Sequence, residues 1–315
     1  MIEPYELIWI SPILSQAETE GLFYWVNLHL TETRLKPLSS FSKIRVEILT
    51  EPKECLKLSF PVHSIGVEHS IELFKEAIWC EILANTQPVS KPLAISFLPS
   101  RILRIPRKLV CFDMDSTLIN QEVIDEIARS NGLFDQVSKI TASAMEGQVD
   151  FKTSLKDRVK LFRGLSIYQF ENVIPSLTLT EGAEKLLGQL KYQGVRTAIV
   201  SGGFELILNH FKKELDIDQV HGNKVQIDEK QNLTGELIEP IIDAEAKRSL
   251  VSKMKANYHA EAAETIAVGD GANDIPMMSL AGISVSFCGK PKLASFVNTL
   301  IFDRNLLWLQ RIGEY

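Results

Sequence analysis

The stretch "RKLVCFDMDSTLINQEVIDEIA" (residues 107–128) decides what kind of fold this chain can form. Its apolar run, Leu109 to Phe112, is typical of a buried strand and ends abruptly in Asp113. A second carboxylate, Asp115, follows two residues later. Two neighbouring carboxylates repel each other, so the rest of the chain must supply something that compensates their charge.

From residue 108 onward, short apolar strands alternate with amphipathic helices. Several of these strands end in polar clusters: DMDST at 113–117, SGGF at 201–204 and GDGAND at 269–274. The alternation predicts an α/β fold with a parallel sheet that is covered on both faces. Ligands bind beyond the carboxyl ends of the strands in such sheets, so we expect the three clusters to meet at one rim.

Two segments interrupt the alternation. Residues from about 120–181 are mostly helical in pattern and fit a helical cap inserted into the sheet domain. Residues 219–242 fit two short strands around a polar turn, hence a hairpin. The catalytic domain is therefore predicted to span 108–315, with its core built from 108–119 and 182–315.

The first hundred residues have the pattern of a small α+β domain. Strand patterns occur at 43–49 and 92–99, and a helical pattern with apolar residues on one face occurs at 70–86. No cluster of reactive side chains stands out in residues 1–100, and the basic residues of 101–107 fit a solvated linker. We expect a separate N-terminal domain, and a regulatory role for it is left open.

Composition and charge disfavour several classes of protein. The net charge of −6 argues against a nucleic-acid binder, which usually has a basic face. No apolar run approaches the ~18 residues of a membrane helix, and the first residues are acidic where a signal peptide would be basic. The four cysteines are scattered without a CxxC pair, which favours a reducing cytoplasm over a disulfide framework or a zinc site.

The acids expected at the rim point to a metal and to phosphoryl chemistry. Asp113 and Asp115 alone could form an Asx turn that caps a helix. Asp270 and Asp274 are expected at the same rim, however, and four converging carboxylates need a cation such as Mg²⁺, which prefers hard oxygen ligands. Alternate residues of an extended segment point the same way, so one Asp could attack phosphorus while the other transfers protons.

The SGGF cluster offers a place for a phosphate. Ser201 lies at a strand end, Gly202 and Gly203 allow the backbone to come close, and the N-terminus of the following helix favours an anion. Taken alone, a cluster of this kind is more often a plain turn. Lys247 lies in a predicted helix 23 residues before Asp270 and by itself would count as a surface lysine.

Together these motifs resemble the haloacid dehalogenase (HAD) superfamily of phosphotransferases, whose catalytic domain is a Rossmann-like (Rossmannoid) parallel sheet. DMDST is similar to the first motif of that superfamily, Ser201 to the second, Lys247 to the third and GDGAND to the fourth. The second Asp of DMDST is similar to the phosphatase branch. Across residues of about 108–303 a closer resemblance is to the phosphoserine phosphatase family, in the blocks FDMDSTLINQEVIDEIA, ITASAMEGQVDFKTSLKDRVKLFRG, VSGGF, AVGDGANDIPMMSLAG and KPKL.

The resemblance implies a catalytic pair and a metal site. Asp113 would be the nucleophile and Asp115 the general acid and base. Mg²⁺ would be held by Asp113, Asp270 and the main-chain carbonyl of Asp115, and Asp274 would orient the metal's surroundings. The chain departs slightly from the family pattern at Gly289, where alanine is common.

The resemblance also implies a set of substrate contacts. They are chemically reasonable, because a zwitterionic head group needs one anionic and one cationic partner and Arg can bind a carboxylate with two hydrogen bonds. The matching residues are Glu122 for the amino group, Arg158 for the carboxylate, Ser201, Gly202 and Lys247 for the phosphate, Asn273 for a further contact, and Met145 and Phe151 as the lining of the closed cap.

The activity that the resemblance implies is Mg²⁺-dependent hydrolysis of O-phospho-L-serine through an aspartyl-phosphate, the final step of L-serine biosynthesis. Two alternatives stay open at this point: a related phosphatase or phosphotransferase acting on another small phosphate ester, and a non-catalytic regulatory protein on the same scaffold. No nucleic-acid or membrane partner is expected. The sequence does not determine the oligomeric state, and a homodimer is possible.

Overall fold

The computed structural model of the chain describes residues 5–33, 45–49, 55–62, 68–146 and 149–313. Their strands form one sheet in the order β2-β3-β1-β4-β11-β10-β9-β5-β6-β7-β8. The strands are β1 (Tyr5–Ser11), β2 (Arg45–Leu49), β3 (Cys55–Val62), β4 (Ala94–Pro99), β5 (Leu109–Phe112), β6 (Arg196–Phe204), β7 (Gln219–Ile227), β8 (Leu233–Ile238), β9 (Thr265–Gly269), β10 (Ile283–Phe287) and β11 (Thr299–Ile301).

The centre of the sheet is parallel, from β11 through β10, β9, β5 and β6 to β7. Both flanks are antiparallel, with β4 paired to β11 on one side and β8 paired to β7 on the other. The predicted α/β fold with a parallel core sheet is confirmed, and so is the hairpin, which β7 and β8 form. Strand β5 lies between β9 and β6 in the parallel part of the sheet, so the strand that leads into DMDST ends between the strands that lead into the other two clusters.

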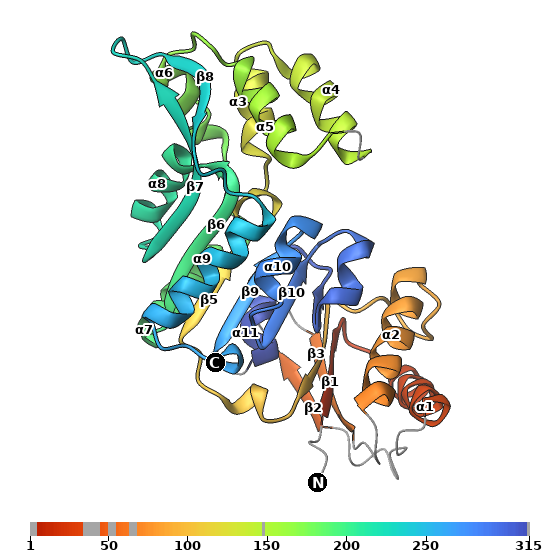
Figure 1. Cartoon of the computed structure of the whole chain (residues 1–315). Coiled ribbons are helices and arrows are strands. Elements are labelled where there is room, and N and C mark those ends of the chain that lie inside the picture. The colour runs from red at the N-terminus through yellow and green to blue at the C-terminus, as the bar shows by residue number, and fades with distance from the viewer. Residues whose placement is uncertain (1–4, 34–44, 50–54, 63–67, 147–148, 314–315) are drawn as a thin grey trace.

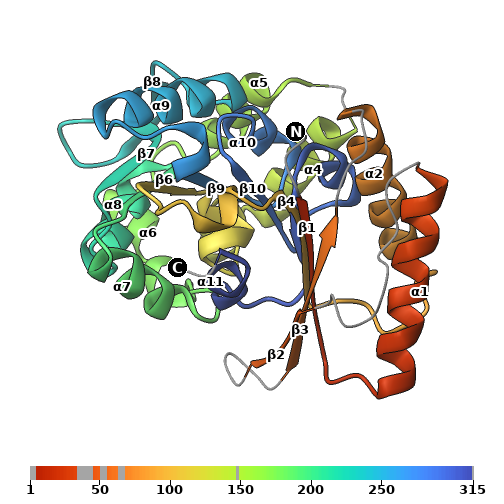
Figure 2. The ribbon, with the colours of Figure 1, turned by 90° about the horizontal axis from the view of Figure 1, so that it is seen from below.

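Helices cover both faces of the sheet (Figure 2). One face packs against α1 (Gln16–Glu32), α2 (Glu68–Ala84), α9 (Ala244–Asn257) and α10 (Ile275–Met278), and the other against α7 (Ala183–Tyr192), α8 (Glu205–Glu214) and α11 (Leu307–Gly313). The buried strand β5 alternates between these two cores, since Val110 and Phe112 join one and Leu109 and Cys111 the other. Burial on both faces explains why the strand reads as a continuous apolar run.

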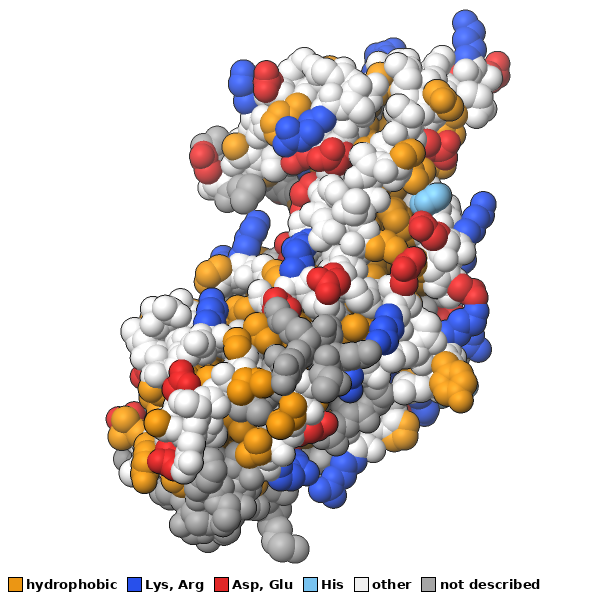
Figure 3. Space-filling view, turned by 180° about the vertical axis from the view of Figure 1, so that it is seen from behind, with side chains coloured by type: hydrophobic (Ala, Val, Ile, Leu, Met, Phe, Trp, Pro, Cys, Tyr) orange, Lys and Arg blue, Asp and Glu red, His pale blue; other side chains and the backbone are white. Residues whose placement is uncertain are grey.

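The helical insertion forms a cap at the carboxyl ends of the central strands, at the top of Figure 1. It contains α3 (Val123–Ser130), α4 (Phe134–Met145), α5 (Phe151–Lys160) and α6 (Ile167–Glu171). The chain enters and leaves the cap at one place, where Ile119 and Leu179 form an isolated antiparallel bridge. Seen from behind, cap and core form two lobes joined by a narrower waist (Figure 3).

The N-terminal unit runs β1-α1-β2-β3-α2-β4 and continues the sheet of the catalytic unit. The predicted helix and the predicted strand that follows it are present as α2 and β4, and Phe74, Ile78 and Ile82 of α2 are fully buried. At the junction, the hydroxyls of Ser96 and Thr299 form a buried hydrogen bond of 2.8 Å. Because the strands of both units belong to one sheet, the division of the chain at residues 101–107 stays a prediction.

One charge of the predicted linker is not solvated. Arg107 is 5% exposed and donates hydrogen bonds to the carbonyls of Ala263 and Ile102. Its guanidinium group thus binds main-chain carbonyls instead of facing water. Among the described residues, no helix is long and apolar enough to cross a membrane.

The shared sheet predicts that both units unfold together. Ile95 is fully buried in β4, between Trp9 of β1 and Leu300 of β11. Ile95→Ala is expected to lower the free energy of unfolding by about 2–5 kcal/mol through the cavity that it leaves. In urea unfolding, tryptophan fluorescence and far-ultraviolet circular dichroism should shift together. Two separate transitions, with only one of them moved by the substitution, would contradict a cooperative sheet.

Candidate active site

The DMDST segment turns sharply at the end of β5. Asp113 is only 5% exposed, and its Oδ1 accepts a hydrogen bond of 2.8 Å from the N–H of Met114. Ser116 adopts the left-handed region at φ 54°, which reverses the chain just after Asp115. The turn leaves both Asp113 and Asp115 facing the cleft described below.

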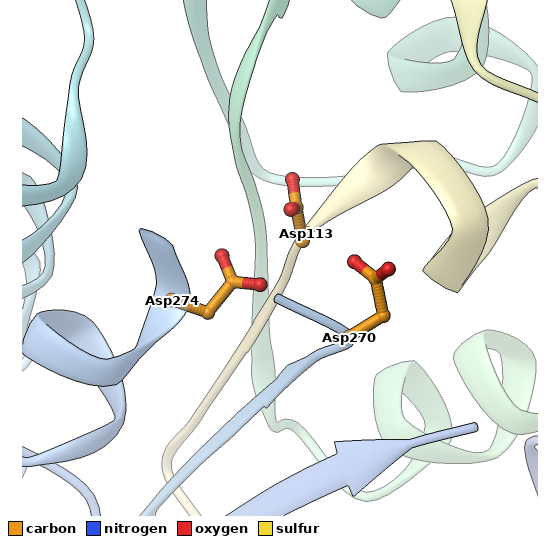
Figure 4. Close-up of side chains that lie close together, drawn as sticks. All are labelled: Asp113, Asp270 and Asp274. Atoms are coloured by element: carbon orange, nitrogen blue, oxygen red, sulfur yellow. The ribbon is translucent and has the colours of Figure 1, made fainter. Parts of the chain in front are cut away.

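Three carboxylates from two strand ends converge at this rim (Figure 4). Oxygen atoms of Asp113, Asp270 and Asp274 lie within 4.8 Å of one another. Burial, with repulsion from Asp113, raises the pKa of Asp270 to about 6 and that of Asp274 to about 8. Clustered, buried carboxylate oxygens are the donor set of a hard divalent cation, which would remove this repulsion. The residues present therefore fit the predicted metal.

Lys247 lies directly beside these acids. Its ammonium group is 1% exposed and contacts Oδ2 of Asp113 at 2.9 Å and Oδ1 of Asp274 at 2.7 Å. Burial alone would lower the pKa of Lys247, but the two carboxylates outweigh it and raise that pKa above its usual range. Asp274 is held further by the N–H of Gly271, which donates to its Oδ2 at 3.1 Å. Lys247 and Asp274 thus form a buried support under Asp113.

The SGGF loop ends β6, which is the neighbour of β5 on the side away from β9. Ser201 is 1% exposed, and its hydroxyl accepts a hydrogen bond of 2.9 Å from the N–H of Gly203. A Cβ placed on Gly203 would stand 3.4 Å from Oδ2 of Asp115, so the loop backbone is close to this acid. Burial, then repulsion from Glu122 and Asp113, raises the pKa of Asp115 well above its ordinary value.

A cleft of about 420 Å³ separates this rim from the cap. Most of the predicted site residues line it. They are Asp113, Asp115, Glu122, Phe151, Arg158, Ser201, Gly202, Asp270 and Asn273. Lys247 and Asp274 are in the layer beneath the lining: Lys247 contacts Asp113, and Asp274 contacts Lys247. The side chain of Met145 lies outside the described residues, so its predicted place in the cap stays a prediction.

The cap side of the cleft carries charges of both signs. Oε1 of Glu122 accepts a hydrogen bond of 2.8 Å from Ser116, and burial raises the pKa of Glu122. Arg158 donates from Nε to the carbonyl of Ser154 at 3.2 Å, and burial lowers its pKa although Asp125 and Glu122 oppose that change. An acid and a half-buried guanidinium that line one cleft suit a ligand that carries both an ammonium and a carboxylate.

Several lining residues escaped the sequence analysis. Asp125 lies three residues after Glu122, one helical turn away, and that spacing could have indicated it. Lys290 lies in the KPKL block and also lines the cleft, while its N–H donates to the carbonyl of Asp270 at 3.1 Å. The departure at Gly289 has a steric basis, since a Cβ there would stand 2.9 Å from that same carbonyl.

Comparison with known proteins agrees with this geometry. Residues 107–282 match the model of the haloacid dehalogenase-like hydrolases, and the chain belongs to that family. It is therefore a phosphatase of the haloacid dehalogenase type, and the resemblance drawn from its motifs is confirmed. A solved haloacid dehalogenase family hydrolase from Salmonella enterica serovar Typhi is 26% identical, covers 98% of both chains and superposes with a TM-score of 0.77.

Its more similar relatives are phosphoserine phosphatases. The enzyme of that name from Methanocaldococcus jannaschii is 41% identical over 200 residues, which are 64% of this chain and 94% of the relative. The one from Lactococcus lactis subsp. lactis is 41% identical over 199 residues, 63% of this chain and 92% of the relative. A structure described as a phospho-aspartyl intermediate analogue of phosphoserine phosphatase is 40% identical, covers 66% of this chain and 99% of its own, and has a TM-score of 0.61.

The buried ion pairs of Lys247 predict a metal-dependent stability. Without a divalent cation, Lys247→Met is expected to lose about 3–5 kcal/mol of unfolding free energy, because two buried carboxylates lose their counter-charge. Mg²⁺ should recover more stability in this variant than in the wild type. Thermal unfolding with and without Mg²⁺ measures both effects.

A matched control for this experiment lies on the same helix. Lys255 is half-buried and donates to the carbonyl of Leu280 at 2.7 Å, away from the acids. Lys255→Met should lose less stability and leave the response to Mg²⁺ unchanged. If the two variants behave alike, the support given to Asp113 and Asp274 is not electrostatic.

Proposed function

We propose that this phosphatase hydrolyses O-phospho-L-serine to L-serine and phosphate with Mg²⁺, through an aspartyl-phosphate, as the last step of L-serine biosynthesis. The observation that carries the proposal is one cleft with two chemically different ends. Asp113 lies at the end formed by the core, and Glu122 and Arg158 lie at the end formed by the cap. The names and structures of the relatives support the same substrate.

Asp113 is the proposed nucleophile. Its carboxylate is held by the N–H of Met114 and the ammonium group of Lys247, which fix its orientation before the substrate arrives. One oxygen of Asp113 forms a bond to phosphorus while the bond from phosphorus to the serine oxygen breaks. Lys247 and the backbone of the Ser201–Gly203 loop supply positive potential for the charge on the transferred phosphoryl group.

Asp115 is the proposed proton carrier. It lines the same cleft as Asp113 and lies beside the SGGF loop at Gly203. In its protonated form it gives a proton to the leaving serine oxygen. The resulting carboxylate then takes a proton from the water that attacks the aspartyl-phosphate, which releases phosphate and restores Asp113.

Asp113, Asp270 and the main-chain carbonyl of Asp115 are the proposed ligands of Mg²⁺. When bound, the ion would neutralise negative charge on the carboxylates and on the phosphoryl oxygens. Asp274 is held between Lys247 and the N–H of Gly271, and we propose that it positions these ligands from below.

The cap is proposed to choose the substrate. Glu122 pairs with the amino group, Arg158 binds the carboxylate, and Asn273 contacts the substrate from the core side. Phe151 closes the cleft, since its Cζ would stand 2.9 Å from a Cβ placed on Gly202, and Met145 is proposed to join it. Closure of this kind excludes bulk water from the reaction. Phosphate esters of sugars and nucleotides lack the zwitterion that this end of the cleft suits.

The substrate proposal predicts a clear preference in a phosphate-release assay. Phosphoserine should be hydrolysed far faster than a sugar phosphate or a nucleotide, and chelation of divalent cations should abolish the activity. Asp113→Asn serves as the inactive control, because it removes the nucleophile while keeping the shape of the site. Equal rates on all esters, or full activity after chelation, would sink the proposal.

Removal of the cap cation should affect only substrates that carry a carboxylate. Arg158→Ala is expected to lower kcat/KM for phosphoserine by about tenfold to a hundredfold, the value of hydrogen bonds to a charged group. Phosphoethanolamine, which lacks the carboxylate, should lose much less. Arg129→Ala, an exposed cap arginine that does not line the cleft, is the matched control. The same loss on both substrates would argue against a carboxylate clamp.

A further inference from the structure

The SGGF loop (Ser201–Gly203) forms where the pairing of β6 with β7 skips residues. Val200 pairs with His221, and the next pair along the ladder is Phe204 with Asn223. Four steps along β6 therefore oppose two steps along β7, so Ser201, Gly202 and Gly203 bulge out of the ladder toward the cleft. Backbone groups displaced in this way need partners from outside the ladder.

Asn223 of β7 supplies the partner of one of these groups, the carbonyl of Gly202. Its side chain is 1% exposed, and its Nδ2 donates a hydrogen bond of 2.8 Å to the carbonyl of Gly202. Its Oδ1 accepts a hydrogen bond of 2.8 Å from the N–H of Ile242, and its Nδ2 also reaches the Ile242 carbonyl at 3.4 Å. A single buried amide is thereby committed at both ends to main-chain groups of two different segments.

The second segment leads straight to the lysine of the site. Ile242 precedes Asp243, whose side chain caps the N-terminus of α9 by accepting from the N–H of Ala246. Lys247 follows in the first turns of the same helix and contacts Asp113. The amide of Asn223 is thus a rigid link between the loop that bears Gly202 and the start of the helix that bears Lys247.

The neighbouring Gly222 makes this link sterically feasible. A Cβ on Gly222 would stand 3.0 Å from the carbonyl oxygen of Gly203 and 2.9 Å from the N–H nitrogen of Glu205. Only a residue without a side chain lets β7 pass this close beneath the loop, with Asn223 in reach of Gly202. The amide is suited to the next position, because it offers a donor and an acceptor at once.

We propose that Asn223 is a positioning residue of the reaction: it holds the Gly202 backbone and the Lys247 helix in one register around the phosphoryl group. The proposal rests on the proposed phosphatase function for its consequence in catalysis, but it makes its own prediction for the binding of a bare phosphate. Asn223 does not line the cleft, so it acts only through Gly202 and through Ile242.

The experiment measures the binding affinity of two ligands separately. Inorganic phosphate probes the core end of the cleft, and L-serine probes the cap end, each by calorimetry in the presence of Mg²⁺. Asn223→Leu removes both hydrogen-bonding functions at similar volume. Asn223→Asp keeps the acceptor for Ile242 and replaces the donor to Gly202, so it reports on the loop even if the leucine variant does not fold.

A buried asparagine elsewhere provides the matched control. Asn305 is 3% exposed, donates to Oε1 of Glu181 at 2.7 Å and accepts from the N–H of Leu307 at 2.9 Å, outside the cleft lining. Asn305→Leu should lose comparable stability through the same kind of unsatisfied backbone group. Because it touches neither Gly202 nor Ile242, its affinity for phosphate should equal that of the wild type.

The expected result is a selective loss at one end of the cleft. Both Asn223 variants should raise the Kd for inorganic phosphate by about tenfold or more, the value of misplaced hydrogen bonds to a charged ligand. Their Kd for L-serine should stay that of the wild type, and kcat for phosphoserine should fall with phosphate affinity. Unchanged phosphate affinity in a folded Asn223 variant, or an equal loss in Asn305→Leu, would overturn the proposal.

This design separates the two proposals. If the wild type binds phosphate but neither binds L-serine nor hydrolyses phosphoserine, the substrate assignment fails while the phosphate measurement still decides the role of Asn223. If phosphoserine is hydrolysed and the Asn223 variants bind phosphate normally, the positioning role fails alone.

Discussion

The ammonium group of Lys247 is the interaction on which the rest of the site depends. Carboxylates brought together in a buried place are costly unless they are paired, and Lys247 pairs with Asp113 and Asp274 at the same time. One cation cannot neutralise all the acids of the rim, as the raised pKa values of Asp270 and Asp274 show. Lys247 therefore stabilises the cluster of acids only in part. The negative charge that is left could be neutralised by a divalent cation.

The topology of the sheet explains why these groups can meet at all. DMDST follows β5, SGGF ends β6 and GDGAND follows β9, and β9, β5 and β6 are adjacent and parallel. The proposed chemistry on the phosphoryl group thus belongs to the core. The proposed discrimination between esters belongs to the charges on the cap side of the cleft. Ser116 joins the two tasks, because it belongs to the DMDST turn and donates its hydroxyl hydrogen to Glu122.

How much of this could be predicted from the sequence depended on whether the signal was local. The strand-end clusters were predictable, since an apolar run that stops at Asp113 or Asp270 is visible along the chain. Lys247 was not predictable from its surroundings, because a lysine in a helix shows its burial only once α9 is packed on the sheet. Only the resemblance indicated it.

The residues that were missed share a physical reason. Asn223 matters through two main-chain groups that lie 21 and 19 residues away along the chain, and no pattern around it announces them. In the N-terminal unit, β3 carries Lys57 at a buried position, 3% exposed, paired with Glu47. Leu58 and Phe60 alternate with Lys57 and Ser59 as in a half-buried strand, so the local pattern does not show that the polar face is buried as well.

The N-terminal unit acts on the sheet without entering the site. None of the cleft-lining residues among those described comes from it, and the relative from Methanocaldococcus jannaschii is matched over 94% of its length by only 64% of this chain. What the unit does supply is β4, which pairs with β11 and removes an exposed edge from the catalytic sheet. Its helix α2 also packs on residues 291–296, directly after Lys290, whose N–H binds the Asp270 carbonyl. Any influence of the unit on catalysis must pass through packing of this kind, which also includes the contact of α11 with β4, because none of its described residues lines the cleft.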